Sequence, residues 1–144
     1  NECTVIEFKN GDLLLNMRNY TDDRLRKLSV SKDQGISWGD IFSDESLIEP
    51  ICQASMINIH RPFKKELLAF SNPNSKNARE KMTIQFSLDQ AETWSQKILI
   101  HEGPSAYSNL VQLSNNEIAC LFEGGIKSAY EGIAFKKIKI RDIK

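Results

Sequence analysis

The chain has 144 residues, and its 19 Lys and Arg residues balance its 19 Asp and Glu residues, so the formal net charge at pH 7 is zero. This balance excludes the clustered basic excess that nucleic-acid binding requires. With 40% hydrophobic and 26% charged residues, the chain has the composition of one folded domain and not of a disordered segment, and no apolar run is long enough for a membrane helix.

Apolar residues recur in short blocks with a period of two, separated by clusters of Gly, Asn, Asp and Ser, which is typical of β-strands. No long segment has the 3.6-residue period of a helix, so the sequence predicts an all-β fold. The predicted strands, in chain order, are Thr4–Phe8, Leu13–Met17, Leu25–Ser31, Ala54–Ile59, Glu66–Ser71, Lys81–Leu88, Lys97–His101, Tyr107–Leu113, Glu117–Phe122 and Ile133–Ile140.

Two turn signals predict hairpins between neighbouring strands. Asn10-Gly11 follows the first strand, and Asn and Gly tolerate the positive φ angles that both positions of a two-residue turn need. Residues 114–116 (Ser-Asn-Asn) separate the strands that end at Leu113 and begin at Glu117, and these residue types favour a second tight turn.

An internal repeat lies between the strands. Ser31–Trp38 returns 56 residues later as Ser87–Trp94, and both segments read Ser-x-Asp-x-(Gly/Ala)-x-(Ser/Thr)-Trp. The Asp can accept hydrogen bonds from backbone N–H groups of a turn, the small fifth residue permits a tight bend, and the Trp is expected to fill the adjacent sheet. Ala91 replaces the Gly of the first copy, which puts the turn geometry of the second copy in question.

This repeat resembles the Asp box, or bacterial neuraminidase repeat, a structural hairpin of β-propellers built from four-stranded blades. Neither Asp33 nor Asp89 is therefore expected to be catalytic. At about 50 residues per blade the chain supplies about three blades, whereas propeller rings contain about four to eight. The chain is therefore expected to be part of a larger ring and to have open edges.

The cysteines, histidines and lysines favour structural roles. Three cysteines without a Cys-x-x-Cys pair exclude a zinc ribbon and a dense disulfide framework. Cys52 and Cys120 have apolar neighbours and are expected to be small buried hydrophobes. Two histidines are too few to favour a His-based triad or metal cluster. In segment 136–141 the basic residues alternate with Ile, which is typical of a half-exposed strand protected against edge pairing.

Outside the repeats, polar residues occur near the predicted strand ends and suggest a site. Taken singly, an Arg is usually solvated, Tyr107 is a candidate half-buried strand aromatic, and Glu2 lies beside a chain end. Gln53 either faces a pocket or bonds to the backbone of a loop. Tyr20 and Tyr130 are expected to be packing residues. The candidate site residues, in chain order, are Glu2, Arg18, Gln53, Arg79, Tyr107 and Glu123.

The order and surroundings of these residues resemble the C-terminal half of non-viral, bacterial-type sialidases (exo-α-neuraminidases), over essentially the whole chain. The phrases that carry the resemblance are Asn-Glu-x-x-Val-x-Glu from position 1, Glu49–Ser55, and Pro-Ser-x-Tyr-Ser from position 104. The resemblance implies a six-bladed β-propeller catalytic domain, of which residues 1–144 form the C-terminal half. It also implies that Gln53 is a polar residue facing the substrate pocket.

The resemblance assigns a role to each remaining candidate. Tyr107 resembles the nucleophile, and Glu2 resembles the glutamate that assists it. Arg18 and Arg79 resemble the second and third members of an arginine triad that binds the substrate. Glu123 resembles the glutamate that orients the first triad arginine. That first arginine and the acid/base aspartate lie in the N-terminal half of the family's domain, and no residue of this chain is assigned to either.

These residue types fit the chemistry of sialic acid, which carries a carboxylate on its anomeric carbon. The planar fork of arginine binds a carboxylate through two parallel hydrogen bonds. A carboxylate nucleophile would be repelled by the substrate carboxylate, and the neutral tyrosine known from sialidases avoids this repulsion. Because a phenol has a pKa of about 10, Tyr107 needs a base, which Glu2 can supply.

The resemblance implies a retaining exo-sialidase that releases terminal α-linked sialic acid and needs no metal or organic cofactor. The expected partners are sialylated glycans and the N-terminal half of the same propeller, with no nucleic acid and no membrane span. A secreted or periplasmic location is implied by the family. Two alternatives remain: a trans-sialidase that uses the same residues, and a propeller module that binds sialic acid without turnover.

Overall fold

The computed structural model describes residues 1–143, and within this range it contains ten β-strands and no helix, which confirms the predicted all-β class. Accordingly, no helix in this range is long and apolar enough to cross a membrane. The strands are β1 (Thr4–Glu7), β2 (Leu13–Met17), β3 (Leu25–Ser31), β4 (Phe42–Ile48), β5 (Ser55–Ile59), β6 (Leu67–Pro73), β7 (Glu80–Ser87), β8 (Gln96–Ser114), β9 (Glu117–Gly124) and β10 (Ile133–Lys139).

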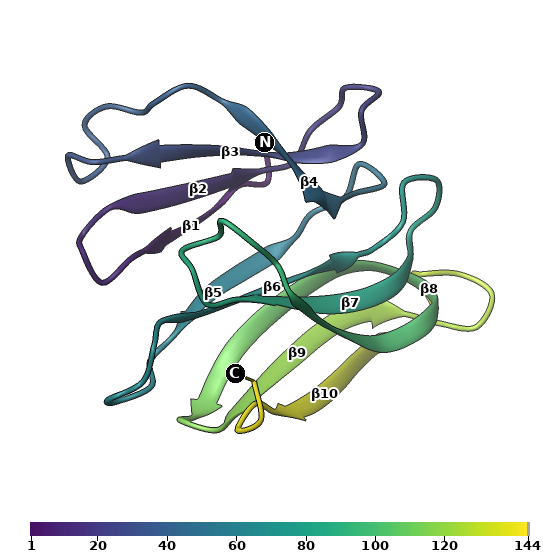
Figure 1. The fold of residues 1–144 in the computed structure, drawn as a ribbon. Coiled ribbons are helices and arrows are strands. Elements are labelled where there is room, and N and C mark those ends of the chain that lie inside the picture. The colour runs from purple at the N-terminus through teal and green to yellow at the C-terminus, as the bar shows by residue number, and fades with distance from the viewer. Residues whose placement is uncertain (144) are drawn as a thin grey trace.

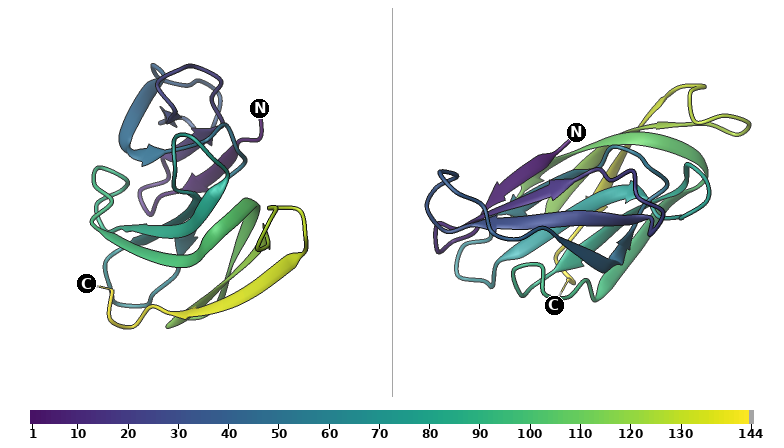
Figure 2. Two further views of the ribbon diagram at one scale, coloured as in Figure 1. Left: turned by 90° about the vertical axis from the view of Figure 1, so that its right-hand side faces the viewer. Right: turned by 90° about the horizontal axis from the view of Figure 1, so that it is seen from above.

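The strands form three antiparallel layers stacked on one another (Figures 1 and 2). The first layer pairs β1, β2, β3 and β4 in chain order. The second pairs β5, β6, β7 and the first part of β8, and the third pairs the second part of β8 with β9 and β10. We call these layers blades 1, 2 and 3. They agree with the predicted supply of about three propeller blades, the third having three strands within this chain.

A hydrophobic core fills each of the two spaces between successive blades, because alternate residues of a strand point to the same face. The core between blades 1 and 2 contains Leu14, Leu28, Leu68, Phe70 and Trp94, among others. The core between blades 2 and 3 is formed by Ile59, Leu67, Ala69, Met82, Ile84, Phe86, Ile100, Leu110, Ile118, Cys120, Phe122, Ile138 and Ile140. Cys120 is buried in this core and Cys52 is buried in a separate cluster with Ala106 and Ala129, which confirms that both are small buried residues.

The two repeats form the same hydrogen-bonded turn. In the first copy the N–H of Ser37 donates to Asp33 Oδ1 over 2.8 Å, and in the second the N–H of Thr93 donates to Asp89 Oδ1 over 2.9 Å. Ala91 adopts a φ of 68° and keeps the geometry that Gly35 adopts at 88°. The second copy is therefore a regular Asp box despite its Ala.

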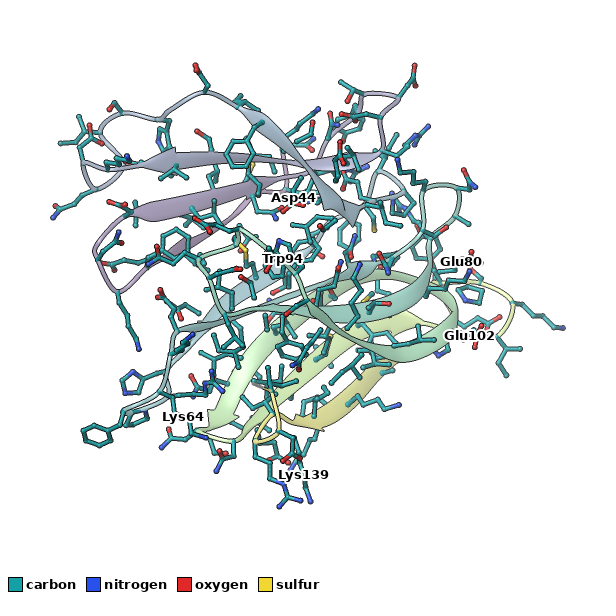
Figure 3. All side chains as sticks on the ribbon, in the orientation of Figure 1. Asp44, Lys64, Glu80, Trp94, Glu102 and Lys139 are labelled. Carbon is teal, nitrogen blue, oxygen red and sulfur yellow. The ribbon has the colours of Figure 1, made fainter. Side chains whose placement is uncertain are left out.

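The two repeat tryptophans differ in environment. Trp94 packs between blades 1 and 2, at 5.9 Å between its ring centre and that of Phe70. Its Nε1 donates to Asp44 Oδ2 over 2.9 Å, and Figure 3 shows these two side chains together. Trp38 is 39% exposed, so the prediction that it fills a sheet is wrong for this chain taken by itself.

The outer faces of blades 1 and 3 are uncovered and carry apolar residues. On blade 1, Val5 is 52% exposed on the side of β1 opposite the core residue Ile6. On blade 3, the paired residues Leu121 and Phe135 are 47% and 57% exposed. Exposed apolar residues are therefore present on the outer faces at both ends of the stack, as expected for part of an unclosed ring.

Three details of the predicted strands are wrong. Strand β4 was not expected, because Phe42–Ile48 is mostly polar; it is the half-exposed edge of blade 1. The predicted strands Lys97–His101 and Tyr107–Leu113 form one continuous strand, β8. The first hairpin forms, but only Gly11 of its turn has a positive φ, and the loop closes through Phe8 N–H donating to Asp12 O instead of a two-residue turn.

Candidate active site

The structure brings Glu2 and Tyr107 into direct contact, although 105 residues separate them. Glu2 precedes β1 with a φ of 50°, a left-handed backbone value that is uncommon for residues other than glycine. Tyr107 lies on β8 just after the strand passes from β7 to β9, with its side chain 37% exposed. The Tyr107 hydroxyl donates a hydrogen bond to Glu2 Oε1. A carboxylate acceptor and a phenol are thus paired at the surface.

The hydrogen bond between Glu2 and Tyr107 shifts the pKa values of the two groups in opposite directions. Burial raises the pKa of Glu2, but the hydrogen bonds from Tyr107 and Arg18 and the charges of Arg18 and Arg79 outweigh it, so the pKa is lowered from 4.5. The hydrogen bond to Glu2 raises the pKa of Tyr107 above 10. At neutral pH Glu2 is therefore charged and Tyr107 is a neutral donor.

Arg18 joins the same group from the end of β2. Its Nη1 donates to Glu2 Oε2 and to the Tyr107 hydroxyl oxygen, the latter over 3.3 Å. Its guanidinium lies 4.9 Å from the ring centre of Tyr20, and its side chain is 11% exposed. Burial lowers the pKa of Arg18, but the hydrogen bond and charge of Glu2 outweigh it and the pKa is raised. The buried Arg18 Nε has no hydrogen-bond partner within residues 1–143.

Arg79 approaches the group from the other side, immediately before β7. Its Cζ lies 5.9 Å from the ring centre of Tyr107. Its Nη2 donates to the carbonyl oxygen of Ile51 over 3.0 Å, and its Nη1 donates to the Tyr130 hydroxyl over 2.6 Å. Two guanidinium groups therefore flank the Tyr107 phenol, and this arrangement can bind an anion beside it.

Glu123 and Gln53 contact the backbone of β8 around Tyr107. The N–H of Tyr107 donates to Glu123 Oε2 over 3.0 Å. The Gln53 amide accepts from the N–H of Ser108 over 2.9 Å and donates to its carbonyl oxygen over 3.0 Å. Of the two predicted roles of Gln53, facing a pocket or bonding to the backbone, its amide therefore takes the second. Its side chain also lines a mainly apolar hollow of about 300 Å³ beside Tyr107.

A larger hollow of about 570 Å³ lies between β3, β4 and the second Asp box. Its walls include Leu28, Phe42 and Ala91, and none of the candidate site residues lines it. It is therefore a gap between two blades and not an extension of the Tyr107 group. Within residues 1–143 no three His, Cys, Asp or Glu side chains are arranged to hold a metal ion.

A buried ion pair that sequence reasoning missed supports the site from below. Arg26 Nη1 donates to Glu49 Oε2 over 2.6 Å with both side chains fully buried, and it also donates to the carbonyl oxygen of Cys52. Glu49 Oε1 accepts from the N–H of Asn19, next to Arg18, over 2.6 Å. The pair therefore fixes both the backbone beside Arg18 and the loop that carries Ile51. An arginine inside the predicted strand Leu25–Ser31 was the available signal, whereas Glu49 lies just after β4.

The predicted packing role of Tyr130 is wrong. It was expected to pack, but it is 64% exposed on the loop between β9 and β10, with its hydroxyl on Arg79. Tyr20 is likewise 57% exposed, although its ring does cover Arg18. The polar, glycine-rich surroundings of Tyr130 are typical of an exposed loop and were the signal that could have placed it at the surface.

Comparison with protein families and with curated proteins identifies relatives of this arrangement. Residues 1–120 match the family described as BNR repeat-like domain. The chain is 34% identical over 149 aligned positions to a sialidase of Bacteroides fragilis (strain YCH46), covering 99% of this chain and 26% of that protein. It is 31% identical over 134 positions to a sialidase of Micromonospora viridifaciens, covering 90% of this chain and 21% of that protein. The chain thus spans about a quarter of the length of these relatives.

Solved structures of sialidases and trans-sialidases share the fold of this chain. The Hadza microbial sialidase Hz136 superposes with a TM-score of 0.83 at 33% identity, covering 96% of this chain and 27% of that one. The intramolecular trans-sialidase from Ruminococcus gnavus, in complex with oseltamivir carboxylate, superposes with a TM-score of 0.80 at 21% identity, covering 96% of this chain and 32% of that one. The three-layered stack is therefore part of a sialidase-type β-propeller.

Proposed function

This chain belongs to the bacterial-type sialidase family with BNR repeats, a family of glycoside hydrolases, and from this premise we propose that the protein is a retaining exo-α-sialidase. It releases terminal α-linked sialic acid from glycoconjugates through a covalent sialyl-tyrosine. The observation that carries the proposal is the hydrogen-bonded group of Tyr107, Glu2 and Arg18, with Arg79 beside the Tyr107 ring.

Substrate binding rests on the two arginines. Sialic acid carries its carboxylate on the anomeric carbon, so an anion bound by Arg18 and Arg79 lies next to the carbon that Tyr107 attacks. Arg18 donates from Nη1 to Glu2 and to the Tyr107 hydroxyl oxygen, which leaves its other terminal nitrogen, Nη2, for the substrate carboxylate. The site is open enough to admit the ligand, because Tyr107 between them is 37% exposed.

The first chemical step transfers the sialyl group to the protein. The Tyr107 oxygen attacks the anomeric carbon while its proton passes to Glu2 Oε1, to which it is already bonded. The bond between the anomeric carbon and the leaving oxygen breaks, and that oxygen takes a proton from an acid in the remainder of the catalytic domain. Because the raised pKa keeps Tyr107 neutral, the attack avoids repulsion by the substrate carboxylate.

The second step returns the free enzyme. Water attacks the anomeric carbon of the sialyl-tyrosine and gives its proton to the group that acted as acid. Glu2 returns its proton to the departing Tyr107 oxygen. Each step inverts the anomeric carbon, so the product keeps the configuration of the substrate. Arg18 donates hydrogen bonds to the Glu2 carboxylate and to the Tyr107 oxygen, and its charge stabilises the negative charge that builds on the Tyr107 oxygen.

The partner of this chain in the site is the N-terminal half of the same six-bladed propeller. Its blades cover the outer faces of blades 1 and 3, where Val5, Trp38, Leu121 and Phe135 are exposed. It supplies the first triad arginine, which Glu123 orients, and the acid/base aspartate. The protein acts outside the cytoplasm, secreted or periplasmic, where sialylated glycans are met.

The test is turnover of a fluorogenic α-sialoside by the protein that contains this chain, with the first-formed anomer identified by NMR. Release of sialic acid as the α-anomer supports retaining hydrolysis, and initial release of the β-anomer excludes it. Residues 1–144 alone should bind substrate poorly and release nothing, because they lack the acid and one arginine.

The same assay separates the alternatives. A trans-sialidase uses the same residues and yields transferred or rearranged sialic acid in place of the hydrolysis product. A binding module yields no product from any α-sialoside but still binds sialic acid. The Tyr107–Glu2 hydrogen bond favours the enzyme, because a binding module needs the arginines but has no use for a phenol paired with a base.

A further inference from the structure

The loop between β9 and β10 (residues 125–132) brings a tyrosine hydroxyl to Arg79. Tyr130 lies 51 residues away in the sequence, and its hydroxyl oxygen accepts a hydrogen bond from Arg79 Nη1 over 2.6 Å. The ring itself is 64% exposed, so Tyr130 adds little to the hydrophobic core. Its contact with Arg79 is therefore the feature that needs an explanation.

The loop is built to hold Tyr130 in one place. The carboxylate of Glu131 accepts hydrogen bonds from the N–H groups of Ile126, Lys127 and Ser128, over 2.7, 3.0 and 3.1 Å. These N–H groups lower the pKa of Glu131, so it remains an anion at neutral pH. Three charge-assisted hydrogen bonds to one carboxylate therefore hold the backbone of this exposed loop together.

Two further contacts fasten the loop to the body of the protein. Ala129 is 7% exposed and packs on Cys52 and Ala106, next to the backbone of Ile51 and Tyr107. Gly125 donates its N–H to the carbonyl oxygen of Pro104 over 3.1 Å. A Cβ at Gly125 would lie 2.3 Å from the Ser128 carbonyl oxygen, so the tight turn requires glycine. The position of Tyr130 is thus tied to the segment that carries Tyr107.

The partners of Arg79 are neutral, in contrast to those of Arg18. Arg18 pairs with the Glu2 carboxylate, whereas no carboxylate lies within ion-pair distance of Arg79 in the described part of the chain. Arg79 is held instead by the Tyr130 hydroxyl and the Ile51 carbonyl. Neutral acceptors fix the direction of a guanidinium without neutralising its charge, which remains available for an anionic ligand.

We propose that Tyr130 is a positioning residue for Arg79: the β9–β10 loop presents its hydroxyl to the guanidinium and so holds Arg79 in the orientation that receives the substrate carboxylate. This inference rests on the proposed function, since Arg79 has a carboxylate to receive only if the ligand is a sialic acid. Tyr130 acts through Arg79 and does not take part in bond making.

The test uses the complete protein and the change Tyr130→Phe, which removes the hydroxyl and keeps the ring. Ile126→Ser is the matched control, because Ile126 lies on the same loop and its side chain is 88% exposed. Each variant is assayed for KM and kcat on an α-sialoside, for calorimetric affinity towards an unsaturated sialic-acid analogue that carries the carboxylate, and for thermal unfolding. The same Tyr130→Phe change is also made in an Arg79→Ala background.

We expect Tyr130→Phe to raise KM and weaken analogue binding by about tenfold, the scale of one hydrogen bond to a charged group. The value of kcat should stay within about twofold, because the clamp holds ground state and transition state alike. In the Arg79→Ala background the change should have no further effect. The control should match the wild type, and the unfolding midpoints should agree.

Three outcomes would overturn the inference about Tyr130 while leaving the proposed function intact. Wild-type analogue affinity in Tyr130→Phe would show that the hydroxyl does not position Arg79. An equal loss of affinity in the Arg79→Ala background would show that Tyr130 acts independently of Arg79. A lowered unfolding midpoint that accounts for the loss would make the role structural. A wild-type protein that neither binds the analogue nor cleaves the sialoside would refute the proposed function itself, and the role of Tyr130 with it.

Discussion

Replacing Tyr107 with Phe removes one oxygen atom from the centre of the site. That oxygen donates to Glu2 and accepts from Arg18 over 3.3 Å. The Phe ring can keep the contact with Arg79, whose Cζ lies 5.9 Å from the ring centre of Tyr107. The substitution therefore separates the reactivity of the phenol from its packing.

The structure predicts a small effect of this change on the free energy of unfolding and a large effect on turnover. The free energy of unfolding should fall by less than about 1 kcal/mol, because the hydrogen bonds are partly exposed and Glu2 keeps its ion pair with Arg18. Turnover should fall on the order of 10³-fold or more, the scale seen when a nucleophile is removed and only binding and electrostatics remain. Affinity for a carboxylate-bearing analogue should change little, since both arginines are intact.

The assay has three readouts on the complete protein: urea unfolding, calorimetric binding of the unsaturated analogue, and release of a fluorogenic aglycone. In addition, the wild type is treated with a fluorinated sialic-acid probe that slows hydrolysis of the covalent stage, and its peptides are weighed by mass spectrometry. The probe mass should appear on the peptide that contains Tyr107 and be absent from the Tyr107→Phe variant.

Near-normal turnover in Tyr107→Phe, with the α-anomer still released first, would refute the reasoning. Tyr107 would then be a surface aromatic, and the hydrogen bond to Glu2 would have no catalytic use. Probe mass on another residue would refute it equally. Loss of turnover together with loss of the folded state would instead contradict the stability estimate, because the ring and its neighbours should tolerate the change.

The pKa of Glu2 is lowered below 4.5, so Glu2 stays charged above that pH and should not limit kcat/KM at pH 5; an acid limb with a midpoint above pH 5 that vanishes in Glu2→Gln would contradict this. Ala91→Gly should raise the free energy of unfolding by about 0.5–1 kcal/mol in urea, because Ala91 has a φ of 68° and glycine adopts that angle without strain; unchanged or lower stability would contradict it. Of the three thiols, exposed Cys3 should react with an alkylating reagent at pH 8, while burial raises the pKa of Cys52 and Cys120 to about 11 and should protect both, as peptide mapping with and without denaturant will show.

The alternation of apolar residues was enough to predict most strands, and the failures have local causes. Strand β4 has few apolar residues because it is an edge with one half-buried side, so its pairing with β3 and not its composition defines it. Gly103-Pro104 reads as a break in the chain. Pro104 is tolerated inside β8 because it lies where the strand leaves β7 for β9, so its missing N–H costs no ladder bond.

For the candidate site, the order of motifs led to residues that lie together in space, but it could not reveal what holds them. Arg79 and Tyr130 are 51 residues apart, and Arg26 and Glu49 are 23 apart. No local period links such pairs, since the Arg79–Tyr130 contact forms only when blades 2 and 3 and their loops have packed, and the Arg26–Glu49 contact forms only when β3 has paired with β4. A buried Arg or an exposed Tyr breaks the usual burial preference of its residue type, and composition alone predicts the opposite.

The sharing of β8 between two sheets has a consequence for hydrogen exchange. Its first part pairs with β7 and its second part pairs with β9. Blades 2 and 3 therefore cannot separate without disrupting the backbone hydrogen bonds of this continuous strand. Blade 1 shares no strand with them and joins them through a core and a loop. Amide exchange should therefore report two cooperative units, with β7, β8 and β9 opening together and β1–β4 opening on their own. Tyr107 lies on β8 in one unit and Glu2 lies beside β1 in the other, so opening of blade 1 should break the hydrogen bond between Glu2 and Tyr107 without disrupting the strand that carries Tyr107.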